Sequence, residues 1–386
     1  MLLLEAGPRD TDFWIHVPLG YGKLFSRTDL NWAYESEPEP ALNGRRIFTP
    51  RGKVLGGSSS INGLVYIRGQ REDFDGWAIP GWGFDDLLPY FRKSENQSRG
   101  ADPWHGVEGP LAVSDLPRHE LCDAFIASAV ALGIPRNDDF NGATQEGTGY
   151  YQATASRGRR CSKAITLNDD MMSLWRMAIM GLRYLLFKQG PLTVSAGHAA
   201  AFVRTRPELK RPDAQLYLIN FSAAKRGGVL HRHSGFTCAV SQLQVESRGS
   251  VHLRSADPAA APAICYNYLA TENDRRVMVE GLKLVRRIVN TAPMRDYVRA
   301  EVLPGPGVQG DAQWLEYCRA MGETVFHPTS TCRIGSVVDE KLRVRGVSGL
   351  RVIDASVMPA VPSGNINAAV VALAEKGADL VKQENR

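Results

Sequence analysis

Two kinds of hydrophobic pattern alternate along the chain. Apolar residues recur at helical spacing over residues 119–132, 171–187 and 271–290, so each stretch predicts an amphipathic helix. In the first of these, the apolar positions predicted to share one buried face are Phe125, Ile126, Val130 and Leu132. Polar and apolar residues alternate over four short runs, residues 201–204, 214–219, 237–240 and 250–254. That alternation predicts strands of a sheet with one buried face, which the helix over 271–290 covers.

The N-terminus has a different pattern. Leu2, Leu3 and Leu4 form an apolar run that ends in Glu5, as expected of a buried parallel strand followed by an acid. A dinucleotide fold places a strand, a G-x-G-x-x-G turn and a helix before such an acid, and this chain starts after that unit. The one later match, residues 305–310, follows a proline and contains another, so it is interpreted as a loop.

Composition and charge indicate a globular protein and no binding to nucleic acid. A chain of 386 residues and 42.4 kDa forms two domains or one large one. Its 44% hydrophobic and 23% charged residues are typical of a globular protein. The net charge of +5 is mild, and no run of five basic residues indicates binding to nucleic acid.

The cysteine pattern and the apolar runs of the sequence bear on the cellular location of the protein. Six scattered cysteines with no CxxC pair favour reduced thiols, and Cys332 is interpreted as a packing residue. His231 and His233 lack further metal ligands at the right spacing, so no metal site is predicted. No signal peptide is visible, and two arginines interrupt the apolar run over 171–187. We expect a cytoplasmic protein without an integral membrane segment, with peripheral membrane contact as the alternative.

Two polar stretches carry the candidate chemistry. Residues 51–63 contain Gly56 and Gly57 followed by three serines, which lets the backbone lie against a flat or phosphorylated ligand. Near the other end, His327 opens a loop of small polar residues, and Asn365 follows in a Ser-Gly-Asn-Ile-Asn segment. A histidine that takes a proton and an amide that orients its donor suit the oxidation of an alcohol.

Together these stretches resemble the glucose-methanol-choline (GMC) family of FAD-dependent oxidoreductases. The resemblance is carried by Arg-Gly-Lys-Val-Leu-Gly-Gly-Ser-Ser over 51–59, His-Pro-Thr-Ser-Thr-Cys-Arg-Ile-Gly over 327–335 and Ser-Gly-Asn-Ile-Asn over 363–367. The opening Leu-Leu-Leu-Glu-Ala-Gly over 2–7 fits the same family. Residues 181–192 and 247–251 favour its choline-dehydrogenase type, and residues 147–152 and 158–162 resemble positions that line the floor of the site.

The resemblance implies a role for each site residue. His327 is expected to be the base that takes the hydroxyl proton, and Asn365 the second polar group that orients the alcohol. FAD is expected as a non-covalent cofactor, because Ile61 stands where some relatives carry a histidine bonded to the flavin. Glu5 is expected on the adenosine ribose; the residues expected to hold FAD are Glu5, Gly56, Gly57, Ser58, Ser59, Asn62, Gly63, Asp354, Ala355, Asn367 and Ala368.

The resemblance also implies the fold and its division. We expect an α/β (α+β) protein with an incomplete Rossmann-like FAD domain and an antiparallel-sheet substrate domain covered by helices. Residues 1–100 and 331–386 are assigned to the FAD-binding domain, residues 101–160 to the substrate domain, and residues 161–330 mainly to the substrate domain. After residues 162–164 the chain passes over a stretch found in the family, which predicts an internal deletion.

Three functions stay open at this point. The first is an FAD-dependent alcohol dehydrogenase that passes electrons to a quinone-like acceptor. The second is an oxidase of the same family that uses oxygen, and the third is a shortened remnant that cannot hold FAD. The alcohol itself is not assigned, since no cage for a quaternary ammonium is recognised.

Overall fold

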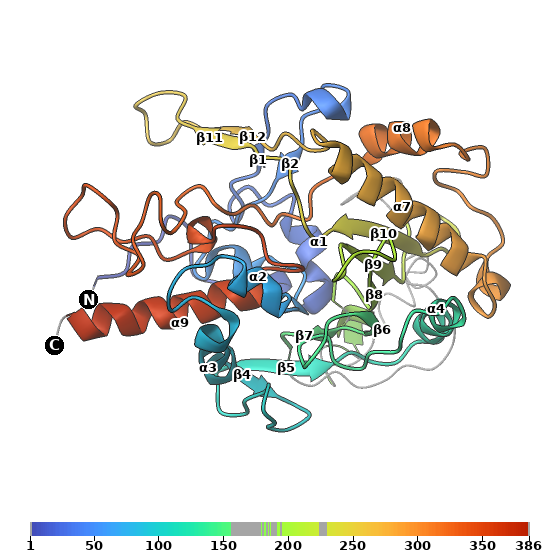
Figure 1. Cartoon of the computed structure of the whole chain (residues 1–386), viewed down its shortest axis with the longest axis horizontal. Helices are drawn as coiled ribbons and strands as arrows, with labels where there is room; N and C mark the ends of the chain where they lie inside the picture. The colour runs from blue at the N-terminus through green and yellow to red at the C-terminus, as the bar shows by residue number, and fades with distance from the viewer. Residues whose placement is uncertain are drawn as a thin grey trace.

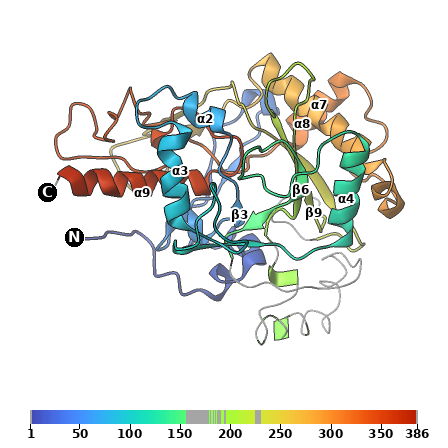
Figure 2. The same ribbon diagram turned by 60° about the horizontal axis from the view of Figure 1, so that its bottom comes forward.

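A central sheet lies between two groups of helices (Figures 1 and 2). At one end, α9 (Asn367–Glu384) packs along α3 (Phe84–Ser94). At the other end lie α4 (Glu120–Ala131), α7 (Glu272–Val289) and α8 (Asp311–Met321). The computed structural model describes residues 2–155, 179, 181, 182, 184, 186, 191–193, 195–223 and 230–384.

The central sheet has the strand order β10-β9-β8-β6, and all its pairs are antiparallel. In β9, Ala214, Leu216 and Leu218 are fully buried, while the alternate residues turn to the opposite face. This alternation confirms the predicted period of two in β9, and the runs predicted over 201–204, 214–219 and 237–240 fall on strands of this sheet. The run predicted over 250–254 differs, because β11 (Ser250–His252) is exposed and pairs with β12 (Ala263–Cys265) in a separate two-stranded sheet. The strands are β6 (Gly147–Tyr150), β8 (Ala199–Val203), β9 (Ala214–Ile219) and β10 (Thr237–Gln242).

Two helices cover one face of this sheet: α7 lies on β10 and β9, and α4 lies on β8 and β6. The predicted helix over 271–290 is confirmed, with Thr271 as its N-cap: the hydroxyl accepts a hydrogen bond from the Asp274 amide at 3.1 Å. The helix predicted over 119–132 also forms, and Phe125 and Ile126 are buried as predicted, but the other two positions of the predicted face are not. Val130 and Leu132 are exposed, because the side that packs on the sheet is the one carrying Leu121 and Phe125.

Smaller elements surround the sheet. A second sheet has the order β3-β7-β5-β4, in which only β4 and β5 are parallel. The strands outside the central sheet are β1 (Tyr34–Glu35), β2 (Phe48–Thr49), β3 (Val65–Tyr66), β4 (Glu95–Gln97), β5 (Leu111–Asp115), β7 (Gln152–Ala153), β11 (Ser250–His252) and β12 (Ala263–Cys265). Two short α-helices are α1 (Tyr21–Leu24) and α2 (Arg71–Asp75). The 3-10 turns are η1 (Phe13–Ile15), η2 (Pro18–Gly20), η3 (Pro40–Leu42), η4 (Gly57–Ser60), η5 (Pro191–Thr193), η6 (Met294–Tyr297) and η7 (Ala355–Val357).

The two ends of the sequence share one hydrophobic core. Phe74, Trp82 and Phe91 from the first hundred residues pack in one buried cluster with Val338 and Leu373 from the last fifty. Burial of such large side chains stabilises the fold by roughly 1.5–3 kcal/mol each. The core therefore brings the two candidate polar stretches into one half of the molecule.

One predicted strand, over residues 2–4, and a second segment, residues 350–353, form no strand in the described part of the chain. Leu2, Leu3 and Leu4 are 82%, 72% and 82% exposed and make no ladder, so the predicted buried strand is wrong. Residues 350–353 form only an isolated bridge, Arg343 to Arg351. A parallel strand needs neighbours that complete its hydrogen bonds, and no strand of the described chain lies beside either segment. The Gly/Pro segment over 305–310 is a loop, as predicted.

The helix predicted over 171–187 lies mostly outside the described residues. The five residues described within it are helical, and the Tyr184 hydroxyl donates to the His16 carbonyl at 2.7 Å. Leu182 and Leu186 are exposed. Within the described part of the chain, no helix combines the length and the apolar character needed to cross a membrane.

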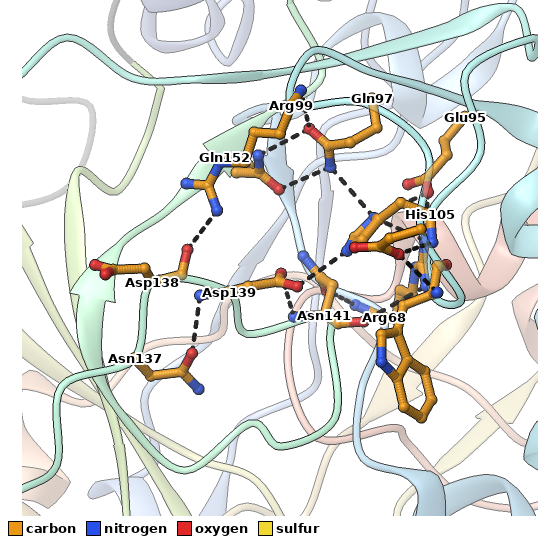
Figure 3. A network of polar contacts seen from close by, with 12 residues as sticks. Arg68, Glu95, Gln97, Arg99, His105, Asn137, Asp138, Asp139, Asn141 and Gln152 are labelled. Carbon is orange, nitrogen blue, oxygen red and sulfur yellow. Dashed lines mark hydrogen bonds and ion pairs between the residues drawn. The ribbon is translucent and has the colours of Figure 1, made fainter.

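A buried ionic network ties the second sheet to the loops around it (Figure 3). Arg68 and Glu95, both almost inaccessible, form an ion pair at 2.6 Å. The His105 ring lies between two carboxylates, with Nδ1 3.0 Å from Glu95 and Nε2 3.0 Å from Asp139. Burial alone lowers the pKa of His105, but the hydrogen bonds to Asp139 and Glu95 outweigh it and raise the pKa to about 9. His105 is therefore a cation at neutral pH, with both ring nitrogens donating.

This network predicts a stability that depends on pH. Because the folded pKa of His105 lies above its ordinary value of 6.5, its contribution is fully present below about pH 6.5 and is lost as the pH rises through 9. The difference in unfolding free energy between wild type and His105→Gln should shrink over that window, by at most about 1.4 kcal/mol per pH unit. Urea unfolding at several pH values measures it. His252→Gln, on exposed β11, is the control with no such trend. A constant gap for His105→Gln would contradict the assignment.

Candidate active site

One large cleft gathers residues from both ends of the sequence. Its volume is ≈ 3000 Å³, well above the roughly 300–1,000 Å³ of an ordinary ligand pocket. Tyr151 from the predicted floor segment also lines it, and residues 158–162 of that prediction lie outside the described residues. The predicted site residues that line the cleft are Gly56, Ser58, Ser59, Asn62, Gly63, His327, Asp354, Ala355, Asn365 and Asn367.

The glycine-rich stretch folds back on itself at the wall of the cleft. Gly56 has a φ of +92°, which only glycine adopts without strain, and the chain then makes the single 3-10 turn η4. Ser59 Oγ donates to the Gly56 carbonyl at 2.6 Å, and Ser58 Oγ accepts from the Gly52 amide at 3.1 Å. Ser58 and Ser59 stay exposed to the cleft.

His327 and Asn365 meet across the cleft wall. The Asn365 side-chain amide lies 3.0 Å from His327 Nε2, although 38 residues separate them in the sequence. Both residues are half-buried, so one side of the pair remains open to the cleft. A proton acceptor and a hydrogen-bond donor held this close can bind one hydroxyl group between them.

Asp73 fixes the segment that carries Asn365. This buried carboxylate, on α2, accepts hydrogen bonds from the Ser363 amide at 2.6 Å and the Ser363 hydroxyl at 2.9 Å. Arg211 also contacts it at 2.8 Å. Burial raises the pKa of Asp73, while the Ser363 and Gln70 hydrogen bonds and the charge of Arg211 oppose that rise. The carboxylate thus anchors the loop two residues before Asn365.

The C-terminal helix begins at the cleft. Asn367 is the first residue of α9 and lines the cleft, whereas Ala368 is 2% exposed and packs in the core beneath it. The first amides of an 18-residue helix have no partner within the helix, and its dipole favours a negative group there. Asp354 caps the turn η7 by accepting from the Ser356 amide at 2.8 Å, and Ala355 follows it at the cleft wall.

Comparison with known proteins identifies the family. The models described as GMC oxidoreductase match residues 21–180 and 245–374. The chain is 32% identical to an alcohol dehydrogenase [acceptor] of Pseudomonas putida, covering 98% of this chain and 90% of that protein. It is 31% identical to an oxygen-dependent choline dehydrogenase of Pseudomonas aeruginosa strain UCBPP-PA14, with coverage of 99% and 90%.

The chain belongs to the GMC oxidoreductase family. It is therefore an oxidoreductase, as the motifs predicted. The alignment to the Pseudomonas putida relative spans 498 positions, more than the 386 residues of the chain. The chain thus passes over positions that the relative contains, in agreement with the predicted internal deletion.

Solved structures of the GMC type share the fold. Pyridoxine 4-oxidase from Mesorbium loti has a TM-score of 0.83 at 24% identity, covering 98% of this chain and 93% of that chain. A formate oxidase variant from Aspergillus oryzae RIB40, studied for modification of its FAD, has a TM-score of 0.86 at 21% identity with the same coverage. The mixed α/β fold with antiparallel sheets is thereby confirmed as the GMC fold.

FAD is the cofactor that the family and these neighbours indicate, and the cleft fits its flavin and phosphate end. The exposed serines of the glycine loop and the N-terminus of α9 are groups that bind phosphate and flavin oxygens. The adenosine end is different. Glu5 is exposed, accepts from the Gly7 amide at 2.9 Å and does not line the cleft. Gly57 and Ala368 also lie outside the cleft lining.

Sequence reasoning missed two residues of the site. Asp73 is one of several acids in a Trp/Gly-rich turn, and nothing in the pattern marks it as the anchor of Ser363. Gln215, the second residue of β9, donates to Asn365 Oδ1 at 3.3 Å. A glutamine within a strand of mainly apolar residues was the available signal for it.

Gly364 provides a direct test of how tightly Asn365 is held. Its φ is +138°, and an added Cβ would lie 2.4 Å from Ile67 Cγ2 in the core. Gly364→Ala should lower the unfolding free energy by about 1–3 kcal/mol from backbone strain, and by a similar amount from overpacking. The control Gly335→Ala also has positive φ, at +88°, but open space around the new methyl. Urea unfolding compares the two. Equal losses would show that the contact with Ile67 is not restrictive.

Proposed function

We propose that the chain oxidises an alcohol to an aldehyde or ketone, with His327 as the base. The single observation that supports the proposal is the 3.0 Å contact between His327 Nε2 and the Asn365 amide at a cleft wall shared with the glycine loop. His327 takes the hydroxyl proton, and Asn365 donates to the hydroxyl oxygen and fixes its direction. An amide holds no basic lone pair, so Asn365 cannot replace the base.

The rest of the cleft positions the reacting groups. Bound flavin supplies the acceptor for the hydride that leaves the carbinol carbon. The glycine loop and the start of α9 hold that cofactor by its phosphate and flavin oxygens. The apolar side chains of Phe25 and Phe326, whose rings are 5.5 Å apart, line the cleft next to His327 and keep water away from the base.

We further propose non-covalent FAD and a four-segment division of the chain. Ile61, where some GMC relatives carry the bonded histidine, is 4% exposed and packs with Leu24, Leu30 and Val54, and its hydrocarbon side chain has no atom that could bond to flavin. The core shared by both ends supports assigning residues 1–100 and 331–386 to the FAD-binding domain. Residues 101–160 and most of 161–330 then form the substrate domain.

The partners proposed are a small alcohol and an electron acceptor that is either quinone-like or oxygen. The named relatives include both acceptor-dependent and oxygen-dependent dehydrogenases. Peroxide release under air, compared with reduction of a quinone dye without air, separates the two acceptors.

Replacing the base should stop turnover without releasing the cofactor. His327→Ala should lower kcat by about 10²–10⁴-fold, because the proton then has no positioned acceptor, while the flavin dissociation constant changes little. Flavin fluorescence titration and steady-state kinetics measure the two quantities. His252→Ala, on exposed β11, is the control that keeps activity. Unchanged turnover in His327→Ala would remove this residue from the reaction.

The mode of flavin attachment has a simple test. After denaturation and ultrafiltration, all flavin absorbance should pass through the membrane, because Ile61 forms no bond to it. Flavin retained with the denatured chain would contradict the proposal. A purified chain that is colourless and gains no flavin absorbance on addition of FAD would favour the shortened remnant over the enzyme.

A further inference from the structure

A chain of polar side chains continues from His327 into the core. Asn365 Oδ1 accepts a hydrogen bond from Gln215 Nε2 at 3.3 Å, and the same Gln215 nitrogen donates to the Tyr151 hydroxyl oxygen. Three consecutive contacts therefore link Tyr151, Gln215, Asn365 and His327. Neither Tyr151 nor Gln215 has a role in the oxidation proposed above.

Gln215 is fixed by its place in the central sheet. It is the second residue of β9, paired with Phe202 of β8 on one side and Ser241 of β10 on the other. Its exposed fraction is 5%, and its neighbours Ala214 and Leu216 are fixed in the core on the other face of the sheet. The amide therefore cannot move away without disturbing two strand pairings.

The direction of these hydrogen bonds decides the state of His327. Both hydrogens of the Gln215 amide nitrogen are used, one on Tyr151 and one on Asn365 Oδ1. Burial raises the pKa of Tyr151, so its hydroxyl stays protonated. Since the oxygen of Asn365 faces Gln215, its NH₂ group must face His327. An NH₂ group can only donate, so the partner nitrogen has to carry a lone pair.

We propose that Gln215 is a positioning residue that keeps His327 in the tautomer with Nε2 unprotonated and the ring proton on Nδ1. Gln215 acts on His327 through its hydrogen bond to Asn365. In this tautomer the nitrogen beside Asn365 carries the lone pair, which can accept the hydroxyl proton once the Asn365 NH₂ group donates to the hydroxyl oxygen instead. With the Asn365 amide reversed, its oxygen would accept from Nε2–H, and the same ring atom could not act as the base. The proposal deepens the function proposed above, on which its catalytic meaning rests.

The isosteric change Gln215→Glu separates orientation from packing. A carboxylate keeps the shape of the side chain but can only accept, so the Asn365 NH₂ group should turn toward it and the Asn365 oxygen toward His327. The neutral His327 ring should then carry its proton on Nε2. Gln215→Leu, which neither donates nor accepts, should give a mixture of both tautomers.

Long-range ¹H–¹⁵N correlation spectra of the chain labelled at histidine report the tautomer directly, and need neither flavin nor turnover. The eight histidines give few signals, and loss of one set in His327→Gln assigns the ring. We expect Nδ1–H in wild type at a pH where the ring is neutral, and Nε2–H in Gln215→Glu. Gln244→Glu is the matched control: Gln244 also lines the cleft, but it donates to the Pro212 carbonyl rather than to Asn365. Its tautomer should match wild type.

Two outcomes would overturn the proposal: an Nε2–H tautomer in the wild-type chain, or the same tautomer in wild type and in both Gln215 variants. In flavin-loaded enzyme, Gln215→Glu should lower kcat on the order of tenfold with a smaller change in KM. An inactive wild type with the expected spectra would reject the proposed oxidation and leave the positioning role intact. Full activity in Gln215→Glu with a switched tautomer would reject the catalytic meaning alone.

Discussion

The buried carboxylate of Asp73 is the contact on which the candidate site depends. It joins α2 to Ser363 across a separation of 290 residues, through both the amide and the hydroxyl of that serine. A buried charge is costly unless it is paired and hydrogen-bonded, so this anion tolerates little displacement of its partners. The segment from Ser363 to Asn367 is therefore held between α2 and the core, and the side chain of Asn365 is aimed at His327. The shared core of Phe74, Phe91 and Leu373 brings the two segments together, and the hydrogen bonds between Asp73 and Ser363 fix their relative position.

The antiparallel sheet contributes side chains both to the core and to the cleft. In β9, residues facing the core alternate with residues facing the cleft. One face supplies Ala214, Leu216 and Leu218 to the core beneath α4 and α7. The other face presents Gln215 and Tyr217 to the cleft. Side chains in a strand point alternately to opposite faces. The six residues of β9 therefore both pack in the core and hold a polar side chain in a fixed direction at the cleft. A site built on such a strand is more precise than one built on loops alone.

The residues expected to bind the flavin end of the cofactor and the residue expected to bind its adenosine end lie in different surroundings. The glycine loop, Asp354 and the start of α9 line one cleft with His327 and Asn365. Glu5 lies outside that lining, on a segment whose leucines are exposed. The chemistry at the carbinol carbon and the binding of the adenosine are thus separate questions for this chain.

The sequence alone determined the local features and the family. Helical spacing located α7 to within one residue at each end, and strand alternation located β9 at its observed bounds. The stretches over 51–59, 327–335 and 363–367 indicated the family through their resemblance to it. Only the tertiary structure decided which residues meet. The buried face of α4, the exposure of Leu2–Leu4, the anchoring of Ser363 by Asp73 and the contact of Gln215 with Asn365 all depend on neighbours distant in sequence. Periodicity records which side of an element is apolar, and it holds no information on what that side packs against.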